Sequence, residues 1–420
     1  MSPQARQELR ELGLKSIQEL ETERGILASG RNEVYGCIFG RDSLITALEL
    51  LQAYRTSRNE YFLQLVGKIL LNLAQLQGSE VNIESGEEPG KIIHEYRPEG
   101  HERLTQGPEN WYLYPDSVMR NFDSVDATPL FLVTVHEYSQ ALEKNSCSGE
   151  IYLTPAQELF SSAQAALAWL TNKLEQSDFL TYEFHPDRTH GGLRTQSWMD
   201  STESLFYETS PEFPRYPIAP VEVQAYAWKA LKLWGQDERA TRLKEDFNKK
   251  FVLRGPNSIS LAFALDGEGK KLSAARSSMG HVLWAAVDTE CVLNAEYIEP
   301  LRKRILARDL FVPSAGVRTL SSRSPHFDPL SYHNGSIWPH DTAMLAEGLD
   351  KFGYADDAKR VRKALLNAYI HFKTPIELFG FSRGFKEYTH PQGGGGACRV
   401  QAWSAASLVA LLNAEEEVYS

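Results

Sequence analysis

The sequence predicts an all-α protein, an (α/α)6 toroid in which six helical hairpins close into a ring, and three observations support this prediction. Hydrophobic residues recur with a period of 3.6 in about a dozen segments of the 420-residue chain. Short and long links alternate between these segments. The alternation typical of strands is scarce, and its clearest example runs from Ser258 to Leu265.

Taken in order, the predicted helices cover residues 3–24, 41–56, 59–77, 124–144, 154–174, 220–234, 236–252, 279–293, 296–307, 339–352, 355–373 and 400–416. The links after the second, sixth, eighth and tenth helices are only a few residues long, so these neighbours must pack as antiparallel hairpins. The links after the first, third, fifth, seventh, ninth and eleventh helices are long. A ring of inner and outer helices satisfies this pattern, and its long loops would gather over the inner N-termini, where free N–H groups favour polar ligands.

A single catalytic domain, residues 1–420, is the simplest organisation that the sequence allows. The chain is 42% hydrophobic, enough to bury a large core. No linker rich in Pro, Gly or Ser divides it, and the densest glycine run, Gly393 to Gly396, immediately precedes the last predicted helix.

Composition and charge exclude several classes of protein. The formal net charge is −11, and no run of Lys or Arg with interleaved aromatics suggests a nucleic-acid partner. The segment from Met1 to Arg24 is too charged for a signal peptide, and no apolar stretch is long enough to span a membrane. We therefore expect a cytoplasmic protein with neither a membrane nor a nucleic-acid partner. The sequence leaves the oligomeric state open.

The cysteines predict reduced thiols. Cys37, Cys147, Cys291 and Cys398 lie far apart in the chain and have no metal-ligand spacing. We expect no disulfide, no zinc or other metal, and no cofactor. A neutral or polar small molecule fits this composition best as a substrate.

Polar residues cluster where the predicted inner helices begin. These segments are Phe39–Asp42, Asp123–Asp126, Pro217–Glu222 and Asn334–Asp341. The Arg41-Asp42 pair could clamp adjacent hydroxyls of a sugar, because arginine donates and aspartate accepts charge-assisted hydrogen bonds. The alternative is an N-capping aspartate with a local ion pair.

Asp200 is the candidate general acid. It lies in a glycine-flanked loop, Gly191 to Ser201, two residues after Trp198. An apolar neighbour can raise the pKa of a carboxyl group, as a general acid requires. Aromatic rings such as that of Trp198 also stack on sugars. The alternative is that Asp200 serves turn chemistry, for which aspartate is common in loops.

Glu377 is the candidate general base. It lies among apolar and aromatic residues in the loop Thr374 to Phe381, with no adjacent lysine, and such a carboxylate is costly to bury without a role. Glu387 is the competitor, but its surroundings, Phe385 to His390, are more polar and typical of a salt-bridged surface group. An inverting hydrolase would hold the acid and the base roughly 6.5–9.5 Å apart.

Taken together, the motifs resemble the catalytic domain of bacterial amylo-alpha-1,6-glucosidase (glycogen-debranching glucosidase) proteins. They span nearly the whole chain, and the most specific is NGSIWPHD within the segment 332–354. The others are FGRDSLITALELL at 39–51, EEPGKIIHEYR at 87–97, DSVDATPLFL at 123–132, QSWMDS at 196–201, PIAPVEVQAY at 217–226, ELFGF at 377–381 and VQAWS at 400–404.

The resemblance implies an inverting hydrolase of a terminal α-glucosidic bond, with α-1,6 favoured, in which Asp200 is the acid and Glu377 the base. It implies that Arg41 and Asp42 hold the terminal glucose of a small or oligomeric glucoside. Further residues match positions that line the pocket: Asp126, Glu222, Trp338, His340, Asp341, Gln401 and Trp403.

Two alternatives remain open. The same fold hosts hydrolases of sucrose and other small glucosides, and the segment Glu208 to Pro217, which departs from the family pattern, could set the choice of substrate. A sugar-binding protein without turnover is the second alternative. A phosphorylase is disfavoured, because it would carry a phosphate site in place of the base Glu377.

Overall fold

The computed structural model describes residues 2–144, 153–255, 258–389 and 396–417. Within these residues the chain forms thirteen α-helices and short strands of two to four residues. It divides into two compact units. The first unit comprises Met1–Gln176, Glu183–Trp198 and Val400–Ser420, and the second comprises Ser177–Tyr182 and Met199–Arg399. The single catalytic domain stays a prediction.

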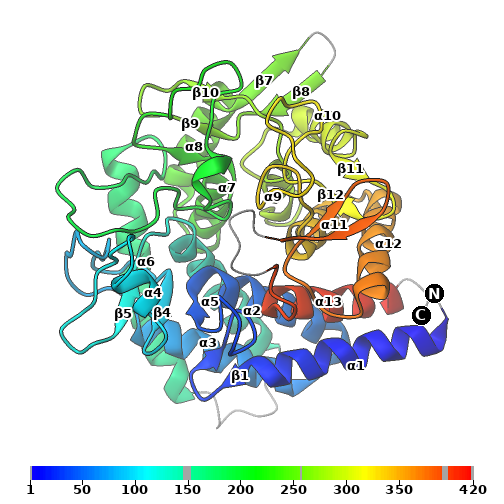
Figure 1. Ribbon diagram of the computed structural model, residues 1–420, viewed down its shortest axis with the longest axis horizontal. Helices are drawn as coiled ribbons and strands as arrows, with labels where there is room; N and C mark the ends of the chain where they lie inside the picture. The colour runs from blue at the N-terminus through cyan, green and yellow to red at the C-terminus, as the bar shows by residue number, and fades with distance from the viewer. Residues whose placement is uncertain (1, 145–152, 256–257, 390–395, 418–420) are drawn as a thin grey trace. The chain divides into compact units, whose positions relative to one another are not determined.

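The first unit joins the two ends of the chain. Helix α13 packs against α1 and α2, so the red and blue ends of the chain lie side by side in Figure 1. Helix α2 also packs against α3 and α5, and α5 packs against α6. The helices of this unit are α1 (Pro3–Leu20), α2 (Gly40–Ser57), α3 (Glu60–Gln75), α4 (Glu102–Thr105), α5 (Ala127–Glu143), α6 (Leu153–Gln176) and α13 (Ala402–Glu417).

The first unit also holds two small antiparallel sheets. One is a hairpin that follows α1, and the other has the order β3-β4-β5 and leads into α2 and α5. The strands are β1 (Glu21–Thr22), β2 (Gly25–Ile26), β3 (Ile38–Phe39), β4 (Glu95–Arg97) and β5 (Met119–Asn121).

The second unit repeats the hairpin pattern. Helix α9 packs against α7, α10 and α11, while α7 packs against α8 and α11 against α12 (Figure 1). Its helices are α7 (Val221–Leu233), α8 (Asp237–Lys250), α9 (Met279–Trp284), α10 (Ala295–Ile305), α11 (Pro339–Lys351) and α12 (Ala355–Phe372), with a 3-10 turn, η1 (Thr202–Ser204).

Short strands close the loops of the second unit. They form one three-stranded sheet of order β10-β9-β6 and three hairpins, β7-β8, β11-β12 and β13-β14. The strands are β6 (Ala219–Pro220), β7 (Val252–Gly255), β8 (Ser258–Leu261), β9 (Ala264–Leu265), β10 (Lys271–Leu272), β11 (Phe311–Val312), β12 (Gly316–Val317), β13 (Phe379–Phe381) and β14 (Phe385–Glu387).

Paired helices differ in how much of their surface they bury. Every residue of α7 from Val221 to Leu231 is buried, whereas α8 buries only Ala240, Leu243 and Phe247. The inner helices also approach closely: a Cβ on Gly348 of α11 would lie 2.7 Å from the backbone nitrogen of Trp284 at the end of α9. Glycine therefore permits the contact between α9 and α11.

The predicted helices are found at their expected places, with two errors of length. The first helix ends at Leu20 rather than residue 24, because the β1-β2 turn follows and Gly25 takes a positive φ of 104°. The helix predicted over 279–293 ends at Trp284, since Asp288 takes a φ of 53° and Val287 and Glu290 form a bridge. The four-residue α4 and most strands are too short to show a period.

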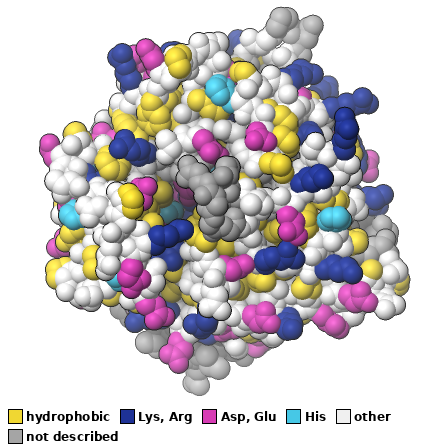
Figure 2. All heavy atoms as spheres, in the orientation of Figure 1, with side chains coloured by type: hydrophobic (Ala, Val, Ile, Leu, Met, Phe, Trp, Pro, Cys, Tyr) yellow, Lys and Arg dark blue, Asp and Glu magenta, His cyan; other side chains and the backbone are white. Residues whose placement is uncertain are grey.

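The surface carries charges of both signs (Figure 2), and the described cysteines are buried. Figure 2 shows Lys and Arg side chains interspersed with Asp and Glu over one face. Among the described residues, no helix is long and apolar enough to cross a membrane, and no cluster of three or more His, Cys, Asp or Glu side chains could hold a metal ion. In the part of the chain that the structure describes, Cys37, Cys291 and Cys398 are buried and form no disulfide, and Cys147 lies outside it.

Candidate active site

Four of the predicted sugar-binding residues form two buried pairs in the first unit, where α2, α5 and α13 begin. Arg41 Nη1 donates to Asp126 Oδ2 at 2.9 Å, and the two side chains are 3% and 0% exposed. Gln401 Nε2 donates to Asp42 Oδ1 at 2.8 Å. Arg41 and Asp42 therefore each bond to a residue that directly precedes another helix. Such buried charges are costly unless they are paired.

Two predicted tryptophans also belong to the first unit. Trp403 lies in the first turn of α13, two residues after Gln401, and Trp198 lies in the QSWMDS motif, where the segment Glu183–Trp198 of this unit ends. Both indole rings are buried. The backbone N–H of Val125 donates to the carbonyl of Gln196 at 2.9 Å, which joins this loop to the segment that precedes α5.

Glu377, the predicted base, lies in the second unit between α12 and β13. Its side chain is 2% exposed. Tyr332 Oη donates to Oε1 at 2.5 Å, and the backbone N–H of Cys398 donates to Oε2 at 2.8 Å. The backbone N–H of Glu377 donates to the carbonyl of Cys398 at 2.9 Å. Both carboxylate oxygens are thus held, which fixes the orientation of the group.

Tyr332, which bonds to Glu377, belongs to a cluster of aromatic rings. The ring of Tyr332 lies 5.0 Å from that of Trp338 and 5.5 Å from that of Tyr388, between centroids. Burial, with the negative charges of Glu203 and Glu377, raises the pKa of Tyr388 to about 12. The Tyr388 hydroxyl therefore stays protonated near neutral pH.

Glu387, the competitor for the role of base, has a different environment. Its side chain is 63% exposed and accepts a hydrogen bond from Arg399 Nη1 at 2.9 Å. The interpretation of Glu387 as a salt-bridged surface group is confirmed.

Asp200, the predicted acid, lies half-buried in the second unit, two residues before η1 begins. The next residue, Ser201, has its Oγ 2.8 Å from His333 Nδ1. Further along the loop, Glu203 accepts a hydrogen bond on its carbonyl from Asn334 Nδ2 at 2.9 Å. The loop that carries Asp200 is therefore bonded to the segment that precedes α11.

The segment Tyr332–Trp338 connects the surroundings of both carboxylates. Tyr332 bonds to Glu377, while His333 bonds to Ser201 and stacks on Trp338 with ring centroids 5.0 Å apart. The indole N–H of Trp338 donates to the carbonyl of Tyr332 at 3.0 Å. The sequence-based site prediction missed Tyr332 and His333, although both begin the YHNGSIWPHD motif, which was the available signal.

Asp341 takes part in a buried chain that links three helices. Its Oδ1 lies 2.8 Å from His281 Nε2, and His281 Nδ1 lies 2.5 Å from Tyr226 Oη. These residues belong to α11, α9 and α7 respectively. Two other predicted residues, Glu222 in the first turn of α7 and His340 beside Asp341, are also fully buried.

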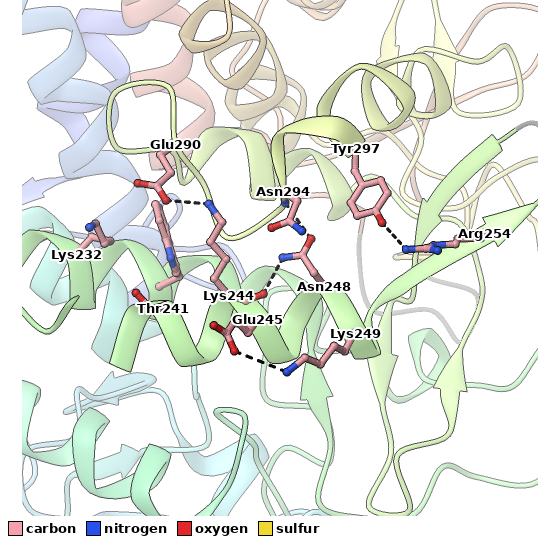
Figure 3. Close-up of a pocket in the computed structure, with 11 residues that line it drawn as sticks. Lys232, Thr241, Lys244, Glu245, Asn248, Lys249, Arg254, Glu290, Asn294 and Tyr297 are labelled. Atoms are coloured by element: carbon pink, nitrogen blue, oxygen red, sulfur yellow. Dashed lines mark hydrogen bonds and ion pairs between the residues drawn. The ribbon is translucent and has the colours of Figure 1, made fainter. Parts of the chain in front are cut away.

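A surface cavity of about 510 Å³ lies elsewhere in the second unit. Figure 3 shows that it is lined by side chains of α8 and of the segment that leads into α10, together with side chains of α7, β7 and α10. Its cations are paired: Lys244 bonds to Glu290 at 2.9 Å, and Arg254 donates to the hydroxyl of Tyr297. None of the predicted site residues lines this cavity.

Comparison with known proteins relates the chain to glycoside hydrolases. Residues 224–404 match the mannosylglycerate hydrolase MGH1-like glycoside hydrolase domain. The mannosylglycerate hydrolases MGH1 and MGH2 of Selaginella moellendorffii are each 32% identical over 112 residues, which is 26% of this chain and 20% of theirs. The match thus spans a fifth of these relatives.

Solved structures share the fold. The crystal structure of GH63 mannosylglycerate hydrolase from Thermus thermophilus in complex with Tris and D-glycerate gives a TM-score of 0.62 at 16% identity, covering 96% of this chain and 99% of that chain. A structure described as "Glycosidase Wild Type" gives 0.56 at 13% identity, covering 98% of each chain. These likenesses confirm the predicted all-α (α/α)6 class.

Together, the comparisons support a glycoside hydrolase of this fold. For the resemblance to amylo-alpha-1,6-glucosidases, the comparisons confirm the fold over nearly the whole chain and a glycoside hydrolase-like domain over residues 224–404. The specificity for α-1,6-glucosides stays a prediction.

Proposed function

We propose that the chain hydrolyses a terminal α-glycosidic bond with inversion, using Asp200 as general acid and Glu377 as general base. The observation that carries this proposal is the setting of Glu377. It is a buried carboxylate held on both oxygens, in the segment that matches a glycoside hydrolase domain. Fixing a carboxylate in one direction is what a base needs to activate a single water molecule.

The proposed reaction needs two proton transfers. Glu377 takes a proton from water as the water oxygen forms a bond to the anomeric carbon. The glycosidic C–O bond breaks, and Asp200 gives its proton to the leaving oxygen. Attack from the face opposite the leaving group converts an α-glycoside into the β-anomer of the free sugar. No metal or cofactor takes part in this mechanism.

The other predicted residues would bind the sugar or shape its pocket. Arg41, Asp42, Asp126 and Gln401 offer the directional donors and acceptors that recognise sugar hydroxyls. We assign the same kind of role to the remaining predicted residues, which are Trp198, Glu222, Trp338, His340, Asp341 and Trp403.

Two substrate classes have specific support. The match of residues 224–404 to a mannosylglycerate hydrolase-like domain favours a small α-hexoside of glycerate. The sequence motifs favour an α-1,6-glucoside, with sucrose or another small glucoside as the alternative. We place the glycerate α-hexosides first, because the match comes from the same segment that holds Glu377.

The test is a hydrolysis panel in which the product anomer is followed by NMR. The panel contains mannosylglycerate, its glucose counterpart, isomaltose, panose, branched limit dextrin, maltose, trehalose and sucrose. We expect release of the β-sugar from at least one α-glycoside, unchanged by a chelator, and turnover near zero in Asp200→Asn. An α-configuration at the anomeric carbon that water attacks would contradict inversion. If no substrate of the panel is hydrolysed, the result would favour a sugar-binding protein without turnover.

A further inference from the structure

Arg276 is a fully buried arginine that the proposed chemistry does not use directly. It lies between β10 and α9, and its backbone forms a bridge with Leu320. Its side chain is 0% exposed. Its guanidinium carbon lies 5.1 Å from the ring centroid of Phe206 and 4.6 Å from that of Phe263. These two rings restrict the plane in which the guanidinium can donate hydrogen bonds.

The guanidinium joins two segments that are far apart in the sequence. Nη1 donates to the carbonyl of His333 at 2.8 Å. Nη2 donates to the carbonyl of Ser204 at 2.6 Å and to Oδ1 of Asn334 at 2.8 Å. Nη1 also lies 3.6 Å from the sulfur of Met199. Arg276 therefore contacts the chain on both sides of Asp200, immediately before it and four residues after it.

Burying the charge of Arg276 in this position costs free energy. Burial lowers the pKa of Arg276 to about 9, although the negative charges of Glu222, Glu208 and Glu203 oppose this effect. A buried charge of this kind adds little net stability, and well-packed apolar residues often serve as well. Its hydrogen bonds do, however, fix the geometry of the groups that accept them.

We infer that Arg276 is a positioning residue for the acid: it holds the Asp200 loop against the His333–Asn334 segment, so that the carboxyl of Asp200 meets the leaving oxygen. This inference rests on the proposed role of Asp200. A lysine cannot replace Arg276 in this role, because its single ammonium lacks the planar fork that reaches three acceptors at once.

The test exploits the leaving group. A sugar fluoride needs little protonation as its bond breaks, whereas an alkoxide leaving group depends on the acid. Each variant is therefore assayed on the best natural-type substrate of the panel and on the α-fluoride of the same sugar. We expect Arg276→Lys to lose kcat on the natural-type substrate by on the order of 10²-fold, as for a misplaced catalytic group, and to keep within about threefold of wild-type kcat on the fluoride.

Two further variants keep the test decisive. Asn334→Ala removes one acceptor of Arg276 and the bond to Glu203 without touching the buried charge, and it should show the same selective loss on a smaller scale. It decides the question if Arg276→Lys fails to fold. Arg362→Lys is the matched control: Arg362 is also buried, but it pairs with Asp350 and has no role in the acid loop. Its ratio of activities should equal that of the wild type.

The outcomes separate the inference from the proposed function. If Asp200→Asn, Arg276→Lys and Asn334→Ala each lose kcat on the natural-type substrate but keep it on the fluoride, this selective loss supports both the proposed function and the role of Arg276. Selective loss in Asp200→Asn alone overturns only the role of Arg276, as does an equal loss on both substrates in the Arg276 and Asn334 variants. If Asp200→Asn itself lacks the selective loss, the assignment of the acid fails and the inference fails with it.

Discussion

Two regions of the second unit use the same residue types in opposite ways. Around Glu377 and Arg276, charged groups are almost fully buried and bond to fixed partners. In the cavity between α8 and α10, the charged groups are accessible: Lys244 and Glu290 form a pair with side chains 22% and 55% exposed (Figure 3). The open cavity is lined by neutralised surface pairs, whereas the buried region holds the groups whose orientation is fixed.

The difference shows where substitutions should matter. An exposed ion pair contributes about 0–1 kcal/mol, because water screens it and both side chains must be ordered. A buried charged group has no water to replace a lost partner, so removing a partner costs more. Substitutions in the open cavity should therefore have small effects, whereas substitutions in the buried region around Glu377 and Arg276 should have large ones.

The largest expected effect is that of Glu377→Gln on turnover. The substitution keeps the shape of the side chain but removes its ability to take a proton, so kcat should fall by on the order of 10³-fold or more on every substrate of the enzyme. The matched control is Glu387→Gln, at an exposed carboxylate that ends the nearby strand β14. Equal activities of the two variants in a steady-state assay would refute the assignment of Glu377 as the base.

The next effect concerns the buried chain that joins α7, α9 and α11. Asp341→Asn removes the charge that accepts from His281, and we expect a loss of about 2 kcal/mol in the free energy of unfolding. Glu245→Gln is the control, because Glu245 and its partner Lys249 are each 63% exposed, so water can solvate both groups. Chemical denaturation measures the free energy of unfolding of the variant and of its control. A loss of stability in Asp341→Asn no larger than in its control would show that the hydrogen bonds among Asp341, His281 and Tyr226 add no stability.

A smaller effect should depend on pH in the first unit. Burial would raise the pKa of Glu84, but hydrogen bonds from His190 and Thr189 outweigh it and lower that pKa to about 2. Because the folded pKa lies below the unfolded value of about 4.5, the carboxylate stabilises the fold above pH 4.5, and this stabilisation is lost as the pH falls towards 2. Glu84→Gln should therefore cost about 1–2 kcal/mol at neutral pH.

The measurement for Glu84 is the difference in unfolding free energy between wild type and variant across this range of pH. The difference should shrink steadily below pH 4.5, since the glutamine does not titrate. A difference that stays constant from neutral pH down to pH 3 would mean that charge plays no part in the bonds to Thr189 and His190.

The helices and the candidate carboxylates could be predicted from the sequence, because the residues within a single segment indicate both. A long helix shows its period within one segment, and Glu377 differs from Glu387 by its immediate neighbours alone. The comparison between these two glutamates was therefore predictable, and the structure gives them the expected burial.

The contacts that orient the site leave no local signal. Arg276 donates to residues 57, 58 and 72 positions away, and nothing in the segment around it marks it as unusual. Arg41 bonds to Asp126, 85 positions away, although Asp42 is its neighbour in sequence. Such pairs are decided by how helices and loops pack, because a buried charge takes whichever partner the fold brings within reach.

The smallest expected effect tests the open cavity. Lys244→Ala removes the ammonium that bonds to Glu290 and lies 5.7 Å from the ring of Trp228. Since Glu290 is more than half exposed, water can solvate it once the lysine is gone, and the free energy of unfolding should change by less than about 1 kcal/mol. Turnover should stay at the wild-type rate. A large loss of activity in Lys244→Ala would mean that the open cavity, and not the buried carboxylates alone, takes part in the function.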